Sequence, residues 1–112
     1  MTSMIYKIVS ASEWREAEAA GRFDGSDVDR RDGFIHFSTR AQVRETAARH
    51  FAGRTGLLLV GVDTSALPIR WERSRGGELF PHLYGSLPVD VVVWSRPLEL
   101  GQDGRHLFPP DI

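Results

Sequence analysis

The stretch MIYKIVSASEWREAEAAG, residues 4–21, decides the first two elements of the fold and their order. Its first part, Met4 to Val9, is rich in β-branched and aromatic residues, which is typical of a β-strand. Ser10 and Glu13 then have the spacing of a helix capping box, so we expect a helix from about Ala11 to Ala20. Gly21 is the expected end of this helix, because glycine readily takes the left-handed conformation that terminates many helices.

Beyond this start, the same signals predict one more helix and several strands. Residues 22–33 are rich in charge and poor in apolar side chains, and we expect them to form a surface loop. Thr39 and Gln42 repeat the capping-box spacing, which predicts a second helix that reaches about Phe51 and ends by Gly53. The further expected strands are Phe34 to Phe37, Leu57 to Val62, Ile69 to Glu72 and Val89 to Trp94.

The order of these elements favours a compact α+β domain with mixed sheets and two early helices, although an α/β arrangement stays open. A doubly wound sheet would need helices between the late strands. The intervals 63–68 and 73–88 are instead punctuated by Gly and Pro and show no helical period. At 112 residues the chain is expected to be one domain.

The composition excludes several kinds of chemistry. The absence of cysteine rules out a disulfide scaffold, a thiolate metal site and a cysteine nucleophile. A net charge of -1 provides no overall field for nucleic acid or an anionic membrane, so neither is expected as a bulk partner. The N-terminal residues lack a signal-peptide pattern and no apolar run could span a bilayer, which favours a soluble, cytoplasmic protein.

The first stretch that could carry chemistry is DGFIHFST, residues 32–39. Side chains alternate along a strand, so Phe34, His36 and Ser38 should share one face. With the helix start behind them, His36, Ser38 and Thr39 could hold a ribose or a phosphate group. The alternative is structural: His36 would be a core histidine bonded to a backbone carbonyl, and a hydroxyl would only cap the helix.

The second such stretch is WERSRGGELFPHLYG, residues 71–85. Its paired glycines could turn backbone N–H groups toward an anion, and Arg75 offers a guanidinium suited to phosphate or carboxylate. The other candidate side chains, for acid–base work, stacking or hydrogen bonding, are Glu72, Ser74, Glu78, His82 and Tyr84. The structural alternative is a β-hairpin with a Gly-Gly turn and charged flanks.

The remaining signals are negative or weak. No G-x-S-x-G motif or phosphate-binding loop is present, and the spacing of the four histidines does not predict a metal site, so no metal is expected. Lys7 lies on the strand face opposite Tyr6 and Ile8, where a solvated lysine is the ordinary interpretation and a substrate contact the alternative.

The chain resembles the bacterial family known as domain of unknown function 952. The resemblance extends over almost the whole chain and is strongest in two stretches, the one ending in His36-Phe37-Ser38-Thr39 and the one from Ser74 to Gly85. Further matching positions are Ile5-Tyr6-Lys7-Ile8, Trp14, Gly21-Arg22-Phe23, Gly25-Ser26, Gln42, Thr46, His50-Phe51, Val62-Asp63, Trp71-Glu72 and Asp103-Gly104.

That family is similar in turn to the ADP-ribosyltransferase superfamily, whose small mixed domains bind NAD in a cleft between two sheet halves. The resemblance implies NAD or another ADP-ribose-type nucleotide as ligand. His36 would contact the ribose, Ser38 and Thr39 would support the nucleotide, and Arg75 would bind the pyrophosphate. Tyr84 would stack on the nicotinamide. The carboxylate that acts at the anomeric carbon is Glu72 or Glu78, and Lys7 stands where the superfamily usually has histidine or arginine.

Two hypotheses about function follow. The first is an ADP-ribosyltransferase-like enzyme whose partner is a small-molecule nucleotide, with the phosphorylated end of an RNA as a further compatible substrate. The second is a non-catalytic module that kept the fold and binds a small anion or a protein through the same cleft. A small hydrolase or isomerase is a third reading that neither hypothesis covers.

Overall fold

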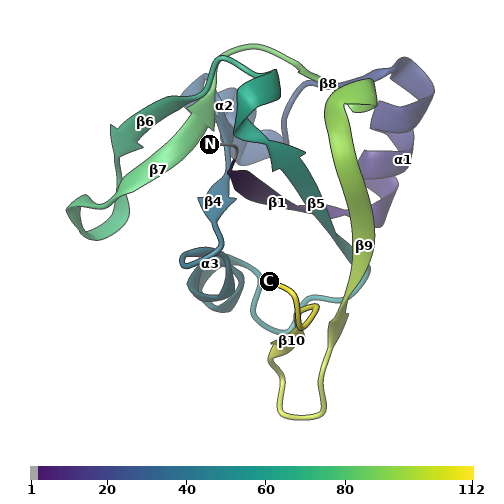
Figure 1. Cartoon of the computed structure of the whole chain (residues 1–112). Helices are drawn as coiled ribbons and strands as arrows, with labels where there is room; N and C mark the ends of the chain where they lie inside the picture. Colours follow the sequence, from purple (N-terminus) through teal and green to yellow (C-terminus); the bar gives the residue numbers. More distant parts are fainter. Residues whose placement is uncertain (1–2) are drawn as a thin grey trace.

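The structure is a computed structural model that describes residues 3–112, and its centre is a five-stranded antiparallel sheet (Figure 1). The sheet has the order β10-β9-β5-β1-β4. Its strands are β1 (Met4–Ser10), β4 (Ser38–Thr39), β5 (Leu57–Asp63), β9 (Val92–Leu100) and β10 (His106–Leu107). The expected strands at the start of the chain and at residues 57–62 are therefore confirmed, and the α+β class is confirmed with them.

Two smaller sheets and three helices complete the domain. A three-stranded sheet has the order β3-β7-β6, and a two-stranded sheet joins β2 to β8. These strands are β2 (Arg22–Phe23), β3 (Ile35–His36), β6 (Arg70–Arg73), β7 (Leu79–Leu83) and β8 (Leu87–Pro88). The helices are α1 (Ala11–Ala20), α2 (Asp27–Asp32) and α3 (Val43–His50), and short 3-10 turns span Thr64–Ala66, Arg75–Gly77 and Val89–Val91.

Helix α1 has the limits and caps that the sequence predicts. The Ser10 hydroxyl accepts the backbone N–H of Glu13, and Gly21 takes a left-handed conformation with a φ of 83°. Helix α3 begins at Val43. Just before it, the side-chain oxygen of Gln42 accepts a hydrogen bond from the backbone N–H of Thr39. Within the described residues no helix is long and apolar enough to cross a membrane.

Three expectations about local structure are wrong. Residues 22–33 are not a loop, because they form β2 and α2. The expected strand at residues 34–37 is divided: β3 joins the three-stranded sheet, and after Phe37 the chain enters the central sheet as β4. The last strand starts at Val92 rather than Val89, because residues 89–91 form a 3-10 turn, and it extends to Leu100.

Both faces of the central sheet are covered. Alternation along β1 sends Ile5 and Val9 into one apolar core, shared with α1 and with β3 and β7, and sends Tyr6 and Ile8 into a second core shared with α3. Lys7 has the same parity as Ile5 and Val9, so its side chain lies on the first, covered face. The ordinary interpretation of Lys7 as a solvated lysine is therefore wrong: only 7% of the residue is exposed.

Candidate functional site

Two histidines lie opposite each other where β3 pairs with β7. The strands are antiparallel, and their register sets His36 directly across from His82. The two imidazole rings are 5.5 Å apart and meet edge to face. The ring of Phe34 stacks on His82 at 4.1 Å and lies 4.5 Å from His36. Phe34 is also 5.2 Å from the ring of Tyr84.

Glu72 joins this group from the neighbouring strand. Its Oε1 accepts a hydrogen bond from Nδ1 of His82 at 2.8 Å and another from the hydroxyl of Tyr84, also at 2.8 Å. These hydrogen bonds, that of His82 first, lower the pKa of the Glu72 carboxyl, whereas the same carboxylate raises the pKa of the Tyr84 hydroxyl. We call Phe34, His36, Glu72, His82 and Tyr84 the Phe34 cluster.

The Phe34 cluster has a buried side and an open side. The His82 side chain is only 5% exposed, whereas the side chains of His36 and Glu72 keep 31% and 35% of their surface open. Tyr84 is half-exposed, and the guanidinium of Arg70 lies over its ring at 5.2 Å. A molecule in solution could therefore reach an imidazole, a carboxylate and an aromatic face at one place, with His82 behind them.

Asp29 of α2 binds His36 from the buried side of the ring. Its carboxylate accepts the backbone N–H of His36 at 3.1 Å and lies 2.7 Å from Nδ1 of the ring. Nζ of Lys7 lies 2.8 and 2.9 Å from the two oxygens of the same carboxylate. The backbone N–H and the hydroxyl of Ser26 also donate to it, at 2.9 and 3.0 Å. Asp29 and Lys7 are thus a buried ion pair directly beneath the candidate site.

Burial acts on both members of this pair. It would raise the pKa of Asp29, but the hydrogen bond from His36 and the charge of Lys7 outweigh it and hold the pKa well below its ordinary value. For Lys7, burial is the larger effect and lowers the pKa, with Asp29 opposing it. Because one partner would be left as a lone buried charge, removing the other should be strongly unfavourable.

The other ring nitrogen of His36 faces a second carboxylate. Nε2 lies 3.0 Å from Oδ2 of Asp32, at the end of α2. A hydrogen bond from Arg31 is the main cause that lowers the pKa of Asp32, and His36 contributes to the same effect. Each ring nitrogen of His36 thus faces one carboxylate, Nδ1 that of Asp29 and Nε2 that of Asp32.

The structure brings together only some of the residues that the sequence suggested. His36, Glu72, His82 and Tyr84 meet in the Phe34 cluster. Glu78 does not join them: it is exposed beside the turn between β6 and β7, where the chain forms the β-hairpin that the sequence offered as the structural alternative. Glu72 is accordingly the carboxylate of this pair that lies in the cluster.

The other suggested binding residues have different neighbours. The hydroxyl of Ser38 is 2.9 Å from that of Thr46, so it ties β4 to α3. Thr39 is half-buried at the start of that connection. Ser74 precedes the hairpin turn, and Arg75 within it lies over the ring of Phe80 at 4.9 Å and reaches Glu45 of α3 at 3.4 Å. The roles of these residues in binding stay predictions.

Sequence reasoning missed Asp29, which is the centre of the buried network. A signal was present, because Ser26 and Asp29 have the three-residue spacing in which the N-cap residue exchanges hydrogen bonds with the third residue of the helix. The structure forms that contact through the backbone N–H of Ser26. No local pattern, however, shows that this helix lies over Lys7, which is far away in the sequence.

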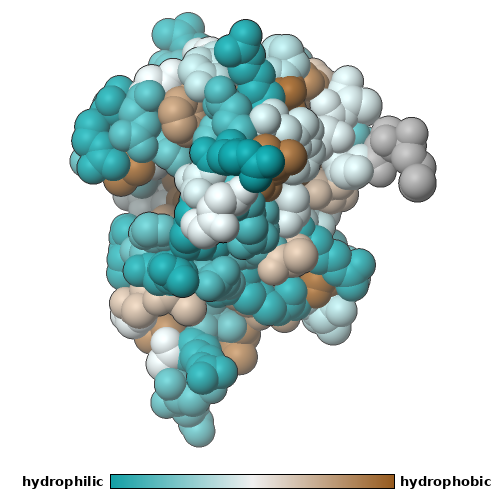
Figure 2. All heavy atoms as spheres, turned by 90° about the vertical axis from the view of Figure 1, so that its left-hand side faces the viewer, coloured by the Kyte–Doolittle hydropathy of each residue, from teal (hydrophilic) through white to brown (hydrophobic). Residues whose placement is uncertain are grey.

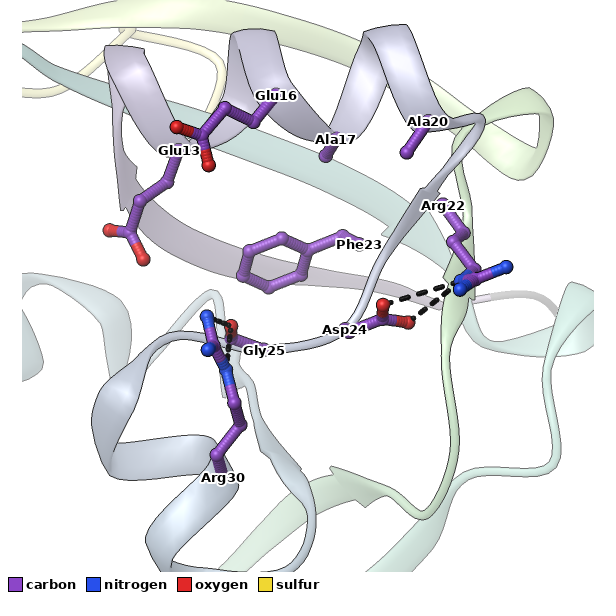
Figure 3. Close-up of a pocket in the computed structure, with 9 residues that line it drawn as sticks. All are labelled: Glu13, Glu16, Ala17, Ala20, Arg22, Phe23, Asp24, Gly25 and Arg30. Carbon is purple, nitrogen blue, oxygen red and sulfur yellow. Dashed lines mark hydrogen bonds and ion pairs between the residues drawn. The ribbon is translucent and has the colours of Figure 1, made fainter.

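Two shallow hollows adjoin this region. One, of about 280 Å³, is bordered by Phe34, Gly33, Gly85 and Ser86 beside the Phe34 cluster. The other, of about 190 Å³, lies between α1 and α2 and shares Asp24 and Arg30 with the first (Figure 3). The cations of this second hollow already have partners, because Arg22 pairs with Asp24 and Arg30 binds the carbonyl of Gly25.

The surface on the side of β6 and β7 is mostly hydrophilic, with small and separate apolar areas (Figure 2). Trp71 and Leu79 are half-exposed on this hairpin. Within residues 3–112, no group of three or more His, Asp or Glu side chains is placed to hold a metal ion.

Fold and site together define a small α+β protein with a histidine–carboxylate cluster on its three-stranded sheet, which we call the smaller sheet. The chain belongs to the DUF952 family of proteins of unknown function, which it matches over residues 8–95.

It is similar to protein CC0527 from Caulobacter crescentus. The crystal structure of that protein is 48% identical, with a TM-score of 0.90 and 94% of each chain covered. Its solution NMR structure is 49% identical, with a TM-score of 0.81 and coverage of 91% of this chain and 90% of that one. None of the curated proteins compared with the chain matches it.

Proposed function

We propose that the Phe34 cluster binds an ADP-ribose-type nucleotide such as NAD and that the protein is an ADP-ribosyltransferase-like enzyme. The observation that carries the proposal is that His36 and Tyr84 lie against the ring of Phe34, on the open side of the smaller sheet, and that Glu72 is hydrogen bonded to Tyr84. An aromatic face, an imidazole and a carboxylate are the groups needed by a flat base, a ribose hydroxyl and a developing positive charge, respectively.

The reaction assigns separate tasks to these groups. The bond between the anomeric carbon of the ribose and the nicotinamide nitrogen breaks, and nicotinamide leaves with the bonding electrons. The carboxylate of Glu72 would stabilise the positive charge that develops on the ribose. The oxygen of an acceptor hydroxyl then forms the new bond to the anomeric carbon and loses its proton to water. His36 would accept a hydrogen bond from a ribose hydroxyl at Nε2, Tyr84 would lie against the base, and buried His82 would orient Glu72 through Nδ1.

A pyrophosphate is negatively charged, so the proposal needs a guanidinium close to the Phe34 cluster, and Arg75 was the expected candidate. That residue is engaged with Phe80 and Glu45 at the hairpin turn. Arg70 instead lies over Tyr84, within the open side of the Phe34 cluster. We therefore propose Arg70 as the guanidinium that approaches the pyrophosphate.

Calorimetry with NAD, ADP-ribose and an RNA carrying a 2′-phosphate tests the binding part of this proposal. We expect at least one of them to bind, and Glu72→Gln to weaken that binding at least tenfold. Glu99→Gln is the matched control, because Glu99 is exposed on β9, in the other sheet, and its variant should bind like the wild type. If folded wild-type protein binds none of the three at millimolar concentration, the proposal is wrong.

A non-catalytic binding module is the second candidate, and one observation favours it. Lys7 stands at the first-strand position of the resemblance but is buried against Asp29, where it contacts no molecule in solution. Chromatographic detection of free nicotinamide separates the two candidates. The enzyme releases nicotinamide from bound NAD and Glu72→Gln abolishes the release, whereas a module binds the nucleotide and releases none.

A further inference from the structure

The carboxylate of Asp29 is fully occupied by groups that converge from three parts of the chain. Lys7 reaches it from β1, Ser26 from the start of α2, and His36 from β3. Five donor groups face it, and an ionised carboxylate has about four lone-pair positions. Asp29 is itself buried. A group held by so many partners has one position, so whatever it binds is fixed with it.

His36 is attached to this fixed carboxylate twice, through its backbone N–H and through Nδ1 of its ring. The two contacts set the course of β3 and the rotation of the ring together. Phe34 packs on one part of the ring and His82 meets it edge to face. Nε2 is thereby directed to the open side, where Asp32 is the group within ion-pair distance.

We propose that Lys7 and Asp29 are positioning residues for His36. They hold its ring so that the hydrogen is on Nδ1 and is donated to the carboxylate of Asp29, and so that Nε2 faces a bound ligand. A histidine whose Nδ1–H is bound by a carboxylate keeps one tautomer and one orientation. Lys7 acts through Asp29: its charge balances a carboxylate that would otherwise be alone in the core. That a ligand binds at Nε2 rests on the proposed function. That the ring of His36 is held in one orientation does not.

Long-range nitrogen–proton NMR of the histidine rings tests this directly, at a pH at which the ring of His36 is neutral. In the wild type we expect the hydrogen on Nδ1. Asp29→Asn should raise the fraction of the Nε2–H tautomer at least tenfold, because the uncharged amide no longer selects one ring nitrogen. Asp63→Asn is the matched control, since Asp63 accepts the backbone N–H of Ser65 and lies outside this network. Asp29, Asp32 and His82 are the titratable groups that face the ring, and Lys7 faces it through Asp29.

Two outcomes would overturn the inference: a wild-type ring with its hydrogen on Nε2, or an Asp29→Asn spectrum that matches that of Asp63→Asn. If Asp29→Asn does not fold, the wild-type spectrum decides, together with Ser26→Ala, which removes a partner of Asp29 nearer the surface and should increase the Nε2–H fraction less. Because this measurement needs no nucleotide, a fixed Nδ1–H ring without nucleotide binding supports the positioning role and rejects the proposed function.

Discussion

At the scale of the residue, Asp29 is the group on which the site depends. Its charge is buried between Lys7 and His36, and each of these partners has a different task. Lys7 comes from the central sheet and balances the charge, whereas His36 belongs to the smaller sheet and uses the carboxylate as a support. One carboxylate thus links the stable centre of the protein to the open cluster.

Asp29→Ala should lower the free energy of unfolding by about 3 to 5 kcal/mol, because Lys7 would remain buried without its partner. Urea unfolding measures this change. Asp111→Ala is the matched control: both Asp111 and its partner Arg96 are exposed to solvent, so loss of that pair should lower the free energy of unfolding much less. A change for Asp29→Ala that is no larger than the control value would contradict the account.

Acid should destabilise the protein through the same residue. The pKa of Asp29 is lower in the folded protein than the value of about 3.9 for an unfolded chain. Its contribution is therefore complete above that unfolded value and is lost as the pH falls toward the folded pKa. Urea unfolding from pH 6 to about pH 2 should show a steeper loss of stability in the wild type than in Asp29→Asn. Equal slopes would mean that another carboxyl governs the acid response.

At the scale of the element, the β6–β7 hairpin presents most of the candidate site. Residues Arg70 and His82 are cross-strand partners, and Glu72 is paired with Phe80, so these side chains share one face of the hairpin. His82 is buried at the place where β3 joins, while Tyr84, two residues later, is half-exposed. Strand β7 therefore holds the ring of His82 in the interior, and the ring of Tyr84, just after the end of the strand, lies at the surface.

Helix α2 is short, and its approach to the site depends on Gly25. A Cβ at Gly25 would lie 2.8 Å from Cβ of Asp29, and the φ of 107° is unfavourable for other residues. Gly25→Ala should therefore lower the free energy of unfolding by at least about 3 kcal/mol, through strain and overpacking. Gly21→Ala is the matched control, because its φ of 83° is similarly strained but its Cβ would meet open space. Thermal unfolding of both variants should rank them in this order; the reverse order would show that α2 tolerates displacement.

The sequence predicts α1, β1 and β5 well because each of these elements carries its own local pattern. Capping residues set the limits of α1, and continuous apolar runs predict strands covered on both faces. Helix α2 carries only the capping spacing of Ser26 and Asp29 and no apolar period: it is polar, and its one buried residue is a carboxylate whose partner is in β1. The same reason explains the candidate site. His36 and Glu72 stand out by type, but their meeting depends on strand pairing between distant segments.

At the scale of the whole molecule, the protein consists of a well-covered central sheet and a smaller sheet that carries the open cluster. The central strands β1, β5 and β9 are long, and apolar cores cover both faces of β1 and β5. In the smaller sheet β3 has two residues and β6 lies at the edge, largely exposed. The net charge of -1 adds no attraction for an anion, so any ligand must be held by local groups.

Hydrogen exchange should reflect this division. Amides of β1 and β5 should exchange only through global unfolding, whereas those of β6 should exchange faster through local opening, since fewer apolar contacts hold that strand. Amide exchange followed by NMR, residue by residue, measures the difference. Equal protection of β6 and β5 would mean that the two sheets form one cooperative unit and that the site is as rigid as the core.

The central claim is that the Phe34 cluster is where the protein binds its ligand. Titration of the labelled protein with ADP-ribose, followed by NMR, tests it most directly. We expect the largest shifts on Phe34, His36, Glu72 and Tyr84, and we expect Glu72→Gln to weaken the response at least tenfold. Shifts confined to residues 74–78 at the hairpin turn, or no shifts at millimolar ADP-ribose, would contradict it.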